Sequence, residues 1–373
     1  MAYRILHVLP WIASGGVEQR RLRLIQHLDP DMFEQRVICK EMRGAVADRM
    51  AETGVQIDVV PGTWAPFDLD SIAAILELIA TWKPDVIHGA VFEGVNMASL
   101  AGYLGQVPHV IVEETGATTW RSWKGDLLMA FSAMLAEKCV AISPHVFRYL
   151  QKRSCISDEK LQLITNGITL EPSPPPSEVA AYRQELGIPA NALVVGSMSR
   201  IYDRFKRFSD LMRAFALLDP DDYDVPLYLL VAGKGPDLDM LKEMAHELGV
   251  SERVVFTGYI REPYRLYPVL DIFSLPSTSE AFGLVVVEAM GAGIPVVTSD
   301  AGAFPDIVDH GKTGLLTPTK NPPELAKALH RLLSNADERK TLGQAAQQMA
   351  KTAFSTERYL SDVEAFYLSI LED

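Results

Sequence analysis

Short apolar segments alternate with longer amphipathic segments along almost the whole chain. Residues 17–28 place five apolar side chains on one face of a helix: Val17, Leu22, Leu24, Ile25 and Leu28. In the first half, the apolar segments predict strands at residues 4–9, 35–39, 56–60, 85–88, 109–113, 138–142 and 161–164. Strands that alternate with helices in this way indicate parallel α/β layers.

The alternation stops at Glu171–Ser177, where four of seven residues are prolines. Proline continues neither a helix nor a central strand, so we expect a semi-rigid linker at 171–177. It would separate an N-terminal domain of residues 1–170 from a C-terminal domain of residues 178–354. Strands of the second domain are predicted at residues 192–196, 227–232, 253–256, 271–275, 295–298 and 315–316.

The C-terminal segment 355–373 is predicted to be largely helical. Its apolar positions form one stripe over residues 355–371, made of Tyr359, Val363, Phe366 and Ile370. Such a stripe needs a partner surface, which the segment itself does not supply.

Composition narrows the class of protein. The chain has 373 residues, 48% of them hydrophobic, enough for the cores of two to three domains of roughly 150 residues. Its net charge of −13 argues against a general nucleic-acid binder, so phosphate would need a local basic site. Three widely spaced cysteines, Cys39, Cys139 and Cys155, predict no disulfide framework and suit a reducing compartment, the cytoplasm. The first residues predict a strand, not a signal peptide, and no apolar run reaches about 18 residues.

Two glutamates are the strongest chemical signal in the sequence. Glu280 precedes a predicted helix, and Glu288 lies inside it among apolar residues. A carboxylate in such a stretch is costly to bury unless it finds hydrogen-bond donors, and a sugar diol supplies two. The turn Phe282-Gly283-Leu284 brings free N–H groups to the helix start, which suits a phosphate. The alternative is a surface glutamate followed by a buried one that bonds to backbone.

Other motifs surround these glutamates in a fixed order. They are Ser14-Gly15-Gly16-Val17-Glu18, Thr165-Asn166-Gly167-Ile168, Val195-Gly196-Ser197-Met198-Ser199-Arg200, Asp203-Arg204-Phe205-Lys206-Arg207, Leu230-Val231-Ala232-Gly233-Lys234-Gly235-Pro236, Val255-Phe256-Thr257-Gly258-Tyr259, Gly293-Ile294-Pro295-Val296-Val297-Thr298 and Gly311-Lys312-Thr313-Gly314-Leu315-Leu316. Together they resemble the family 4 retaining glycosyltransferases of the GT-B fold. The resemblance is densest over residues 194–318.

The resemblance implies two Rossmann-like doubly wound domains that face each other across a cleft, with the last helix crossing back to the first domain. It implies transfer of a sugar from a nucleoside-diphosphate sugar onto a hydroxyl of a glycan, a glycolipid or a small molecule. No cofactor is expected, because the nucleotide sugar is the donor substrate. No metal is expected either, since no aspartate pair of divalent-metal type stands out beside the diphosphate residues. The family mechanism needs no protein nucleophile, since a leaving-group oxygen takes the acceptor proton.

Residue roles follow from the same resemblance. Glu288 would hold the ribose hydroxyls, and Glu280 would contact the donor sugar. Arg200 and Lys206 would offset the charge of the leaving diphosphate. Backbone groups would complete the donor site at Gly15, Gly16, Gly233, Tyr259, Phe282, Gly283 and Leu284. The alternative for Lys206 is a solvated basic cluster with Arg204 and Arg207.

The acceptor side departs from the family pattern. His88 ends a predicted strand and is a candidate catalytic residue that would orient donor or acceptor; a structural histidine is the alternative. Family members often carry a second histidine where this chain has Ala90, and another near Glu113 and Glu114.

The expected acceptor is a glycan or a lipid-linked sugar. The segment Thr118–Met129 mixes tryptophans, cations and apolar residues, as do membrane-interface segments. We expect Trp120–Met129 to border the acceptor path, with peripheral contact at the inner face of the membrane. A core helix with a solvated edge is the alternative. Arg20, Arg21 and Arg23 could meet anionic headgroups, or simply form a solvated helix face.

Rival functions remain within and outside the fold. A nucleotide-sugar 2-epimerase or hydrolase would convert the donor without an acceptor. A non-catalytic nucleotide-sugar-binding protein would not need the cations Arg200 and Lys206. A dinucleotide dehydrogenase is disfavoured, because no Gly-x-Gly-x-x-Gly follows the first strand.

Overall fold

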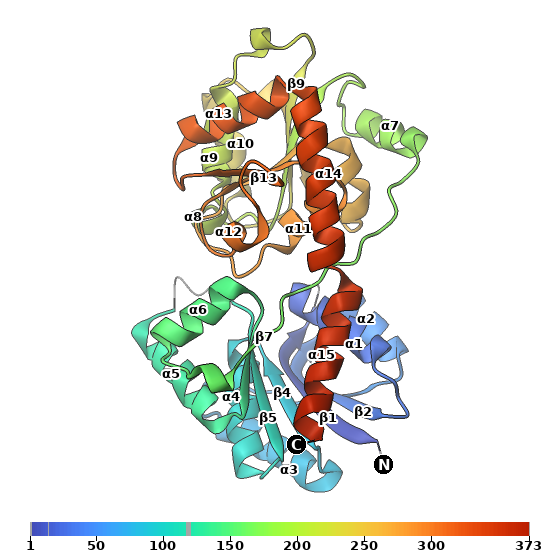
Figure 1. Ribbon diagram of the computed structural model, residues 1–373, viewed down its shortest axis with the longest axis vertical. Coiled ribbons are helices and arrows are strands. Elements are labelled where there is room, and N and C mark those ends of the chain that lie inside the picture. Colours follow the sequence, from blue (N-terminus) through green and yellow to red (C-terminus); the bar gives the residue numbers. More distant parts are fainter. Residues whose placement is uncertain (1, 14, 117–120, 373) are drawn as a thin grey trace. The chain divides into compact units, whose positions relative to one another are not determined.

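The computed structural model describes residues 2–13, 15–116 and 121–372 (Figure 1). The chain divides into two compact units, one made of residues 1–167 with 357–373 and the other of residues 168–356. The chain therefore passes from the first unit to the second and then returns to the first.

The first unit is built on a parallel seven-stranded sheet in the order β3-β2-β1-β4-β5-β6-β7. Its strands are β1 (Tyr3–Ile12), β2 (Phe33–Met42), β3 (Gln56–Val59), β4 (Val86–Ala90), β5 (His109–Glu114), β6 (Lys138–Ala141) and β7 (Leu161–Leu163). Its helices are α1 (Gly16–His27), α2 (Ala45–Glu52), α3 (Leu69–Trp82), α4 (Phe92–Leu104), α5 (Trp123–Leu135), α6 (Pro144–Arg153) and α15 (Thr356–Leu371).

The second unit repeats this plan with six parallel strands in the order β10-β9-β8-β11-β12-β13. The strands are β8 (Leu193–Met198), β9 (Leu227–Ala232), β10 (Val254–Gly258), β11 (Ile272–Leu275), β12 (Val296–Ser299) and β13 (Gly314–Thr317). The helices are α7 (Pro176–Glu185), α8 (Asp203–Lys206), α9 (Phe208–Ala216), α10 (Leu238–Glu247), α11 (Leu284–Gly291), α12 (Phe304–Ile307), α13 (Pro322–Leu333) and α14 (Ala336–Ala353).

Both sheets are doubly wound, which confirms the predicted fold class. Strand order reverses between β1 and β4 in one unit and between β8 and β11 in the other. Every predicted strand is present. The central strands stand out because strands covered on both faces are continuous apolar runs. The first strand is longer than predicted, since Trp11 and Ile12 still pair with Glu41 and Met42 of β2 beyond Pro10.

The proline-rich segment is extended at first and helical at its end. Residues 171–175 form neither helix nor strand, whereas Pro176 and Ser177 already belong to α7. Proline fits the first turn of a helix, where its missing N–H has no intrahelical partner to lose.

The C-terminal helix α15 completes the core of the first unit. Its stripe of Tyr359, Val363, Phe366 and Ile370 is buried, as predicted, and Leu360 and Tyr367 join it. The stripe packs against Ile5, Leu24 and Phe33, among others. In the described part of the chain, no helix combines the length and apolar character that a membrane span requires.

Candidate functional site

The sequence-predicted donor residues gather at one edge of the second sheet. In doubly wound sheets, ligands bind at the carboxyl ends of the strands, where the strand order reverses. Arg200 follows β8, Gly233 follows β9 and Glu280 follows β11, so all three lie at this edge. The strands β8 and β11 that carry Arg200 and Glu280 are the neighbours at the reversal.

Lys206 and Glu280 form the central ion pair of this edge. The ammonium of Lys206, the last residue of α8, contacts Glu280 Oε1. The hydroxyl of Ser277 donates to the same oxygen at 3.1 Å. The carboxylate is therefore fixed by two donors, with both side chains of the ion pair largely withdrawn from solvent.

The other cations near Lys206 have different surroundings. Arg207 makes a two-pronged contact with the carboxylate of Asp210, at 2.7 and 2.8 Å. The exposed Arg204 lies over the ring of Phe205. Arg200 is also exposed, and in the described ranges no residue forms a hydrogen bond or ion pair with its guanidinium. Arg200 thus presents an unneutralised positive charge at the strand end.

The helix start next to Glu280 offers backbone donors. Gly283 caps α11 with φ +98°, in the left-handed region that favours glycine. A Cβ at Gly283 would lie 2.7 Å from Phe304, so space as well as conformation requires glycine. The N–H of Val286 donates to the Gly283 carbonyl at 2.9 Å, so the donors that remain open at the start of α11 are those that precede it. Phe282 is buried, with its ring against Phe354, and it anchors this turn.

Glu288 lies within α11 and has a specific side-chain partner. The Tyr267 hydroxyl donates to Glu288 Oε2 at 2.6 Å. Burial raises the pKa of Glu288, and the Tyr267 hydrogen bond offsets only part of this effect. The alternative prediction of a backbone-bonded glutamate missed Tyr267, which lies 21 residues away in the sequence.

Glycines allow the loops at this edge to touch. Gly233 has φ +133°, and a Cβ there would lie 1.9 Å from the carbonyl oxygen of Ser199. Gly302, which sequence reasoning missed, has φ +60°, and a Cβ there would lie 2.5 Å from both backbone N and O of Glu280. Its position just after β12, at the same strand end, is the signal that could have identified it. Tyr259 is 60% exposed beyond β10.

Gly15 and Gly16 begin α1 in the first unit. Gly15 has ordinary extended dihedrals, and a Cβ there would lie 2.3 Å from Glu18 Oε2, the mobile end of a flexible side chain. Neither conformation nor backbone contact therefore requires glycine at this position. The buried Glu18 folds back over the loop, and burial raises its pKa. Ser14 lies outside the described residues.

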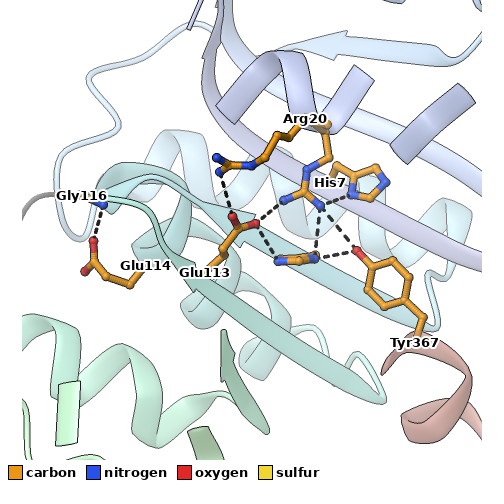
Figure 2. Close-up of polar contacts among 8 residues, drawn as sticks. His7, Arg20, Glu113, Glu114, Gly116 and Tyr367 are labelled. Carbon is orange, nitrogen blue, oxygen red and sulfur yellow. Dashed lines mark hydrogen bonds and ion pairs between the residues drawn. The ribbon is translucent and has the colours of Figure 1, made fainter. Parts of the chain in front are cut away.

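His88 belongs to a buried polar network that joins five elements of the first unit (Figure 2). Its Nδ1 lies 2.6 Å from the Tyr367 hydroxyl of α15 and 3.2 Å from Nη1 of Arg21. Its Nε2 lies 3.4 Å from Glu113 Oε2 of β5. The Arg21 Nη1 also lies 3.1 Å from Nδ1 of His7.

The carboxylate of Glu113 is the anionic centre of this network. It accepts from Arg21 at 3.0 Å and from Arg20 at 3.3 Å. Burial alone would raise the pKa of Glu113, but His88 and the two guanidinium groups outweigh burial and hold that pKa well below its usual range. Burial, and then the charge of Arg21, lower the pKa of His88 to about 4.

The network corrects one prediction about the first helix. Arg20 and Arg21 do not face anionic headgroups, because both are buried and paired with Glu113. Glu114 is buried separately and pairs with Arg121, as neighbouring strand residues point to opposite faces. Ala90 is buried at the end of β4.

Of the segment predicted to border the acceptor path, residues 123–129 lie in helix α5. Trp120 lies outside the described residues. Met129 is buried, whereas Trp123 at the helix start is 70% exposed. In residues 2–13, 15–116 and 121–372, no group of three or more His, Cys, Asp or Glu side chains could hold a metal ion.

Comparison with known proteins agrees with this geometry. Residues 15–167 match the family described as "Glycosyl transferase 4-like domain", and residues 178–349 match "Glycosyl transferases group 1". The chain belongs to the family 4 glycosyltransferases of the GT-B fold.

Individual relatives are similar over part of their length. The D-inositol 3-phosphate glycosyltransferase of Corynebacterium urealyticum is 35% identical over 57% of this chain and 51% of its own. The N-acetyl-alpha-D-glucosaminyl L-malate synthase of Bacillus anthracis is 28% identical over 52% of this chain and 50% of its own. The match thus spans about half the length of these curated relatives. Among solved structures, Anabaena HepE in complex with UDP and glucose has a TM-score of 0.86 at 22% identity, covering 98% of this chain and 100% of its own.

Proposed function

We propose that this protein is a retaining glycosyltransferase that moves a sugar from a nucleoside-diphosphate sugar onto a hydroxyl of a glycan, a glycolipid or a small molecule. The proposal rests on one observation, the Lys206–Glu280 ion pair at the carboxyl ends of the strands of the second sheet. Glu280 lies just before the start of α11, and the unneutralised Arg200 lies at the end of the neighbouring strand. This edge combines cations and backbone donors for a diphosphate with a carboxylate for sugar hydroxyls.

The reaction exchanges one bond for another at the anomeric carbon. The bond from that carbon to the diphosphate oxygen breaks, and a bond to the acceptor oxygen forms on the same face. The acceptor proton passes to an oxygen of the leaving diphosphate. Negative charge grows on the leaving group, and Lys206 and Arg200 offset it. Arg200 would supply a fork of donors and Lys206 a mobile point charge.

Glu280 is better suited to hold the sugar than to attack it. Lys206 and Ser277 both donate to its Oε1, which leaves Oε2 for a sugar hydroxyl. Two donors on the carboxylate stabilise its charge, which makes it a weaker nucleophile. A carboxylate fixed by two donors instead orients the sugar beside the helix N-terminus.

The remaining donor residues would hold the nucleoside. Glu288 would accept from the ribose hydroxyls, and Gly233 and Tyr259 would flank the base at the ends of β9 and β10. Phe282, Gly283 and Leu284 would present backbone to the sugar and the distal phosphate. Gly15 and Gly16 would approach the diphosphate through backbone. UDP and glucose in the HepE complex make uridine diphosphate glucose the first donor to test.

In this proposal His88 is a positioning residue. Its ring is buried and held by Arg21 and Tyr367, so it fixes the end of β4 instead of touching substrate. The free cysteines Cys39, Cys139 and Cys155 suit a reducing compartment, and we place the reaction in the cytoplasm.

A donor panel tests the proposal against its rivals. Uridine, guanosine and adenosine diphosphate sugars are incubated with and without glycan and glycolipid acceptors, and products are identified by mass spectrometry, with NMR for anomeric configuration. Transfer with an unchanged anomeric configuration supports the proposal. Free sugar or an isomerised donor without acceptor would identify a hydrolase or epimerase, and donor binding without turnover would identify a binding protein.

A further inference from the structure

Helix α5 presents an apolar face to solvent. Trp123 is 70% exposed, Leu127 63% and Met134 64%. At 100° per residue these side chains, together with the half-buried Phe131, lie within one quarter of the helix circumference. The apolar face of α5 is defined here as Trp123, Leu127, Phe131 and Met134.

Two polar residues of α5, Asp126 and Ser132, point the other way, into the protein. Buried Asp126 accepts a hydrogen bond from the Tyr149 hydroxyl of α6. Buried Ser132 donates to Asn96 of α4 at 2.9 Å. A surface helix ordinarily buries its apolar side and exposes its polar side. This helix does the reverse over part of its surface, which is costly unless another apolar phase covers it.

The apolar face continues onto the loop before α3. Phe67 is 56% exposed and Leu69, the first residue of α3, is 76% exposed. The rings of Phe67 and Phe131 lie 6.1 Å apart, so loop and helix form one surface. Phe67 has φ +67°, a left-handed conformation that is strained for a bulky residue. The backbone adopts this conformation although it leaves the Phe67 side chain in solvent.

Cations flank the apolar face on both sides. Lys124 is exposed, with its ammonium 5.7 Å from the centre of the Trp123 ring. On the opposite side, Arg153 of α6 is 3.8 Å from Asp126 and keeps most of its side chain in solvent. Lys152 is exposed on the same helix. The net charge of the chain is −13, so cations beside this apolar face are opposite in sign to the net charge.

We propose that the apolar face of α5, with Phe67 and Leu69, docks into the surface of a bilayer that contains anionic lipid. A helix that lies in the interface plane inserts Trp, Phe and Leu side chains at the boundary of headgroups and acyl chains, and flanking cations meet anionic headgroups. A second copy of the chain fits less well, because a two-fold contact would face the same cations against each other. This docking does not depend on the donor chemistry proposed above.

Flotation of the full chain with lipid vesicles tests the proposal. Vesicles of phosphatidylcholine alone are compared with vesicles that also contain phosphatidylglycerol. We expect the protein to float with the anionic vesicles and to lose binding as salt is raised. The triple variant Trp123→Ser, Leu127→Ser, Met134→Ser should lower binding about tenfold or more. The variant Lys124→Glu, Lys152→Glu should lower it by at least about fivefold per cation.

Matched controls lie in the second unit. Leu217 is 59% exposed on a helix end and Lys242 is exposed on α10, so Leu217→Ser and Lys242→Glu should float as the wild type does. The altered side chains point into solvent, so melting temperatures should not change, and the charge variant still tests the surface if the triple variant folds poorly. Equal flotation of wild type and both variants, or none at all, overturns the proposal. So does a wild-type dimer in light scattering that the triple variant converts to monomers without any vesicle binding.

Discussion

Lys206 and Arg200 are expected to act on turnover and not on folding. Arg200 is exposed without a partner in the described structure, and Lys206 contacts a loop glutamate outside the hydrophobic cores. Replacing either with alanine should lower kcat with an increase of about 3–4 kcal/mol in the activation free energy, as for loss of one preorganised donor. Initial rates with a saturating donor measure this effect.

Arg204 offers a control for these two cations. It is exposed on the same short helix as Lys206 but lies over the ring of Phe205. Arg204→Ala should keep kcat within about threefold of wild type, as expected for a surface substitution. If the alanine variants of Arg200, Lys206 and Arg204 all fold and have the same kcat, Arg200 and Lys206 do not stabilise a leaving group.

Glu288 should lower the stability of the folded protein at neutral pH, although it supports nucleotide binding. Its pKa is raised in the folded protein, so the folded state holds its proton over a higher pH range than the unfolded chain. The stability linked to this group is therefore lost as pH rises from about 4.3 through the raised pKa. Glu288→Gln keeps an acceptor for Tyr267 and removes the buried charge. We expect the Glu288→Gln variant to melt at a higher temperature than the wild type at pH 7. This difference in melting temperature should disappear near pH 4.

The same substitution should weaken nucleoside diphosphate binding by about 10- to 100-fold, the effect of losing a hydrogen bond to a charged group. Glu280→Gln is the companion variant, since Glu280 is assigned to the sugar. It should leave the affinity for free nucleoside diphosphate nearly unchanged and lower the rate of transfer. Calorimetry with free nucleotide separates the two roles, and equal losses of affinity in both variants would contradict the division.

At the scale of single residues, the sequence was enough to predict site residues that stand in a local motif. It was not enough to predict contacts between residues that are far apart in the chain. Lys206 and Glu280 were identified because each stands in a recognisable motif. Glu113 was noted only as a departure from the family pattern, since its partners Arg20 and Arg21 lie 93 and 92 residues away. No spacing rule connects residues so far apart, and only the parallel order of β1, β4 and β5 brings them together.

Elements were more predictable than contacts, for a physical reason. Central parallel strands are apolar on both faces, so their runs stand out in the sequence. Helix α5 shows the limit of this reasoning. Periodicity identifies an apolar side of a helix but does not say whether that side faces the core or the solvent, and Trp123 and Leu127 face the solvent.

The network between β1, α1, β4, β5 and α15 should make the first unit sensitive to acid. The pKa of His88 is lowered to about 4 and that of His7 is also lowered, so both take up protons on unfolding. Stability is complete above the ordinary histidine pKa of about 6.5 and falls as pH drops toward the folded value. For His88 alone the loss should be about 2 kcal/mol at pH 5. Glu113, whose pKa is depressed, adds a further loss below about pH 4.3.

Tryptophan fluorescence can follow this loss in urea at pH 7 and pH 5. All tryptophans of the chain lie before residue 124, within the first unit, so their signal reports on that unit. His88→Gln should flatten the pH dependence, whereas His246→Gln, an exposed histidine of α10, should leave it unchanged. An unfolding free energy that is equal at both pH values would show that the buried histidines are not linked to stability.

At the scale of the whole chain, the return of the last segment to the first unit couples the two ends of the sequence. The parallel α/β layers of each unit were predictable, because each half repeats the strand–helix pattern, and the doubly wound plan came from the family resemblance. The partner of the last helix came from the family resemblance; the apolar stripe indicated only that some partner was needed. The structure supplies that partner as a surface that includes Ile5, Leu24 and Phe33.

Deletion of residues 357–373 should therefore unfold the first unit and spare the second. The deletion removes six buried side chains of α15: Tyr359, Leu360, Val363, Phe366, Tyr367 and Ile370. At roughly 1.5–3 kcal/mol for each buried side chain, the loss reaches the whole stability of an ordinary domain, about 5–15 kcal/mol. Residues 168–356 keep their own core and the proposed donor residues after β8, so nucleoside diphosphate binding should remain measurable by calorimetry while transfer disappears. Removal of residues 372–373 alone is the control, because α15 ends at Leu371. Native tryptophan fluorescence and an unchanged melting temperature in the long deletion would show that the first unit folds without this helix.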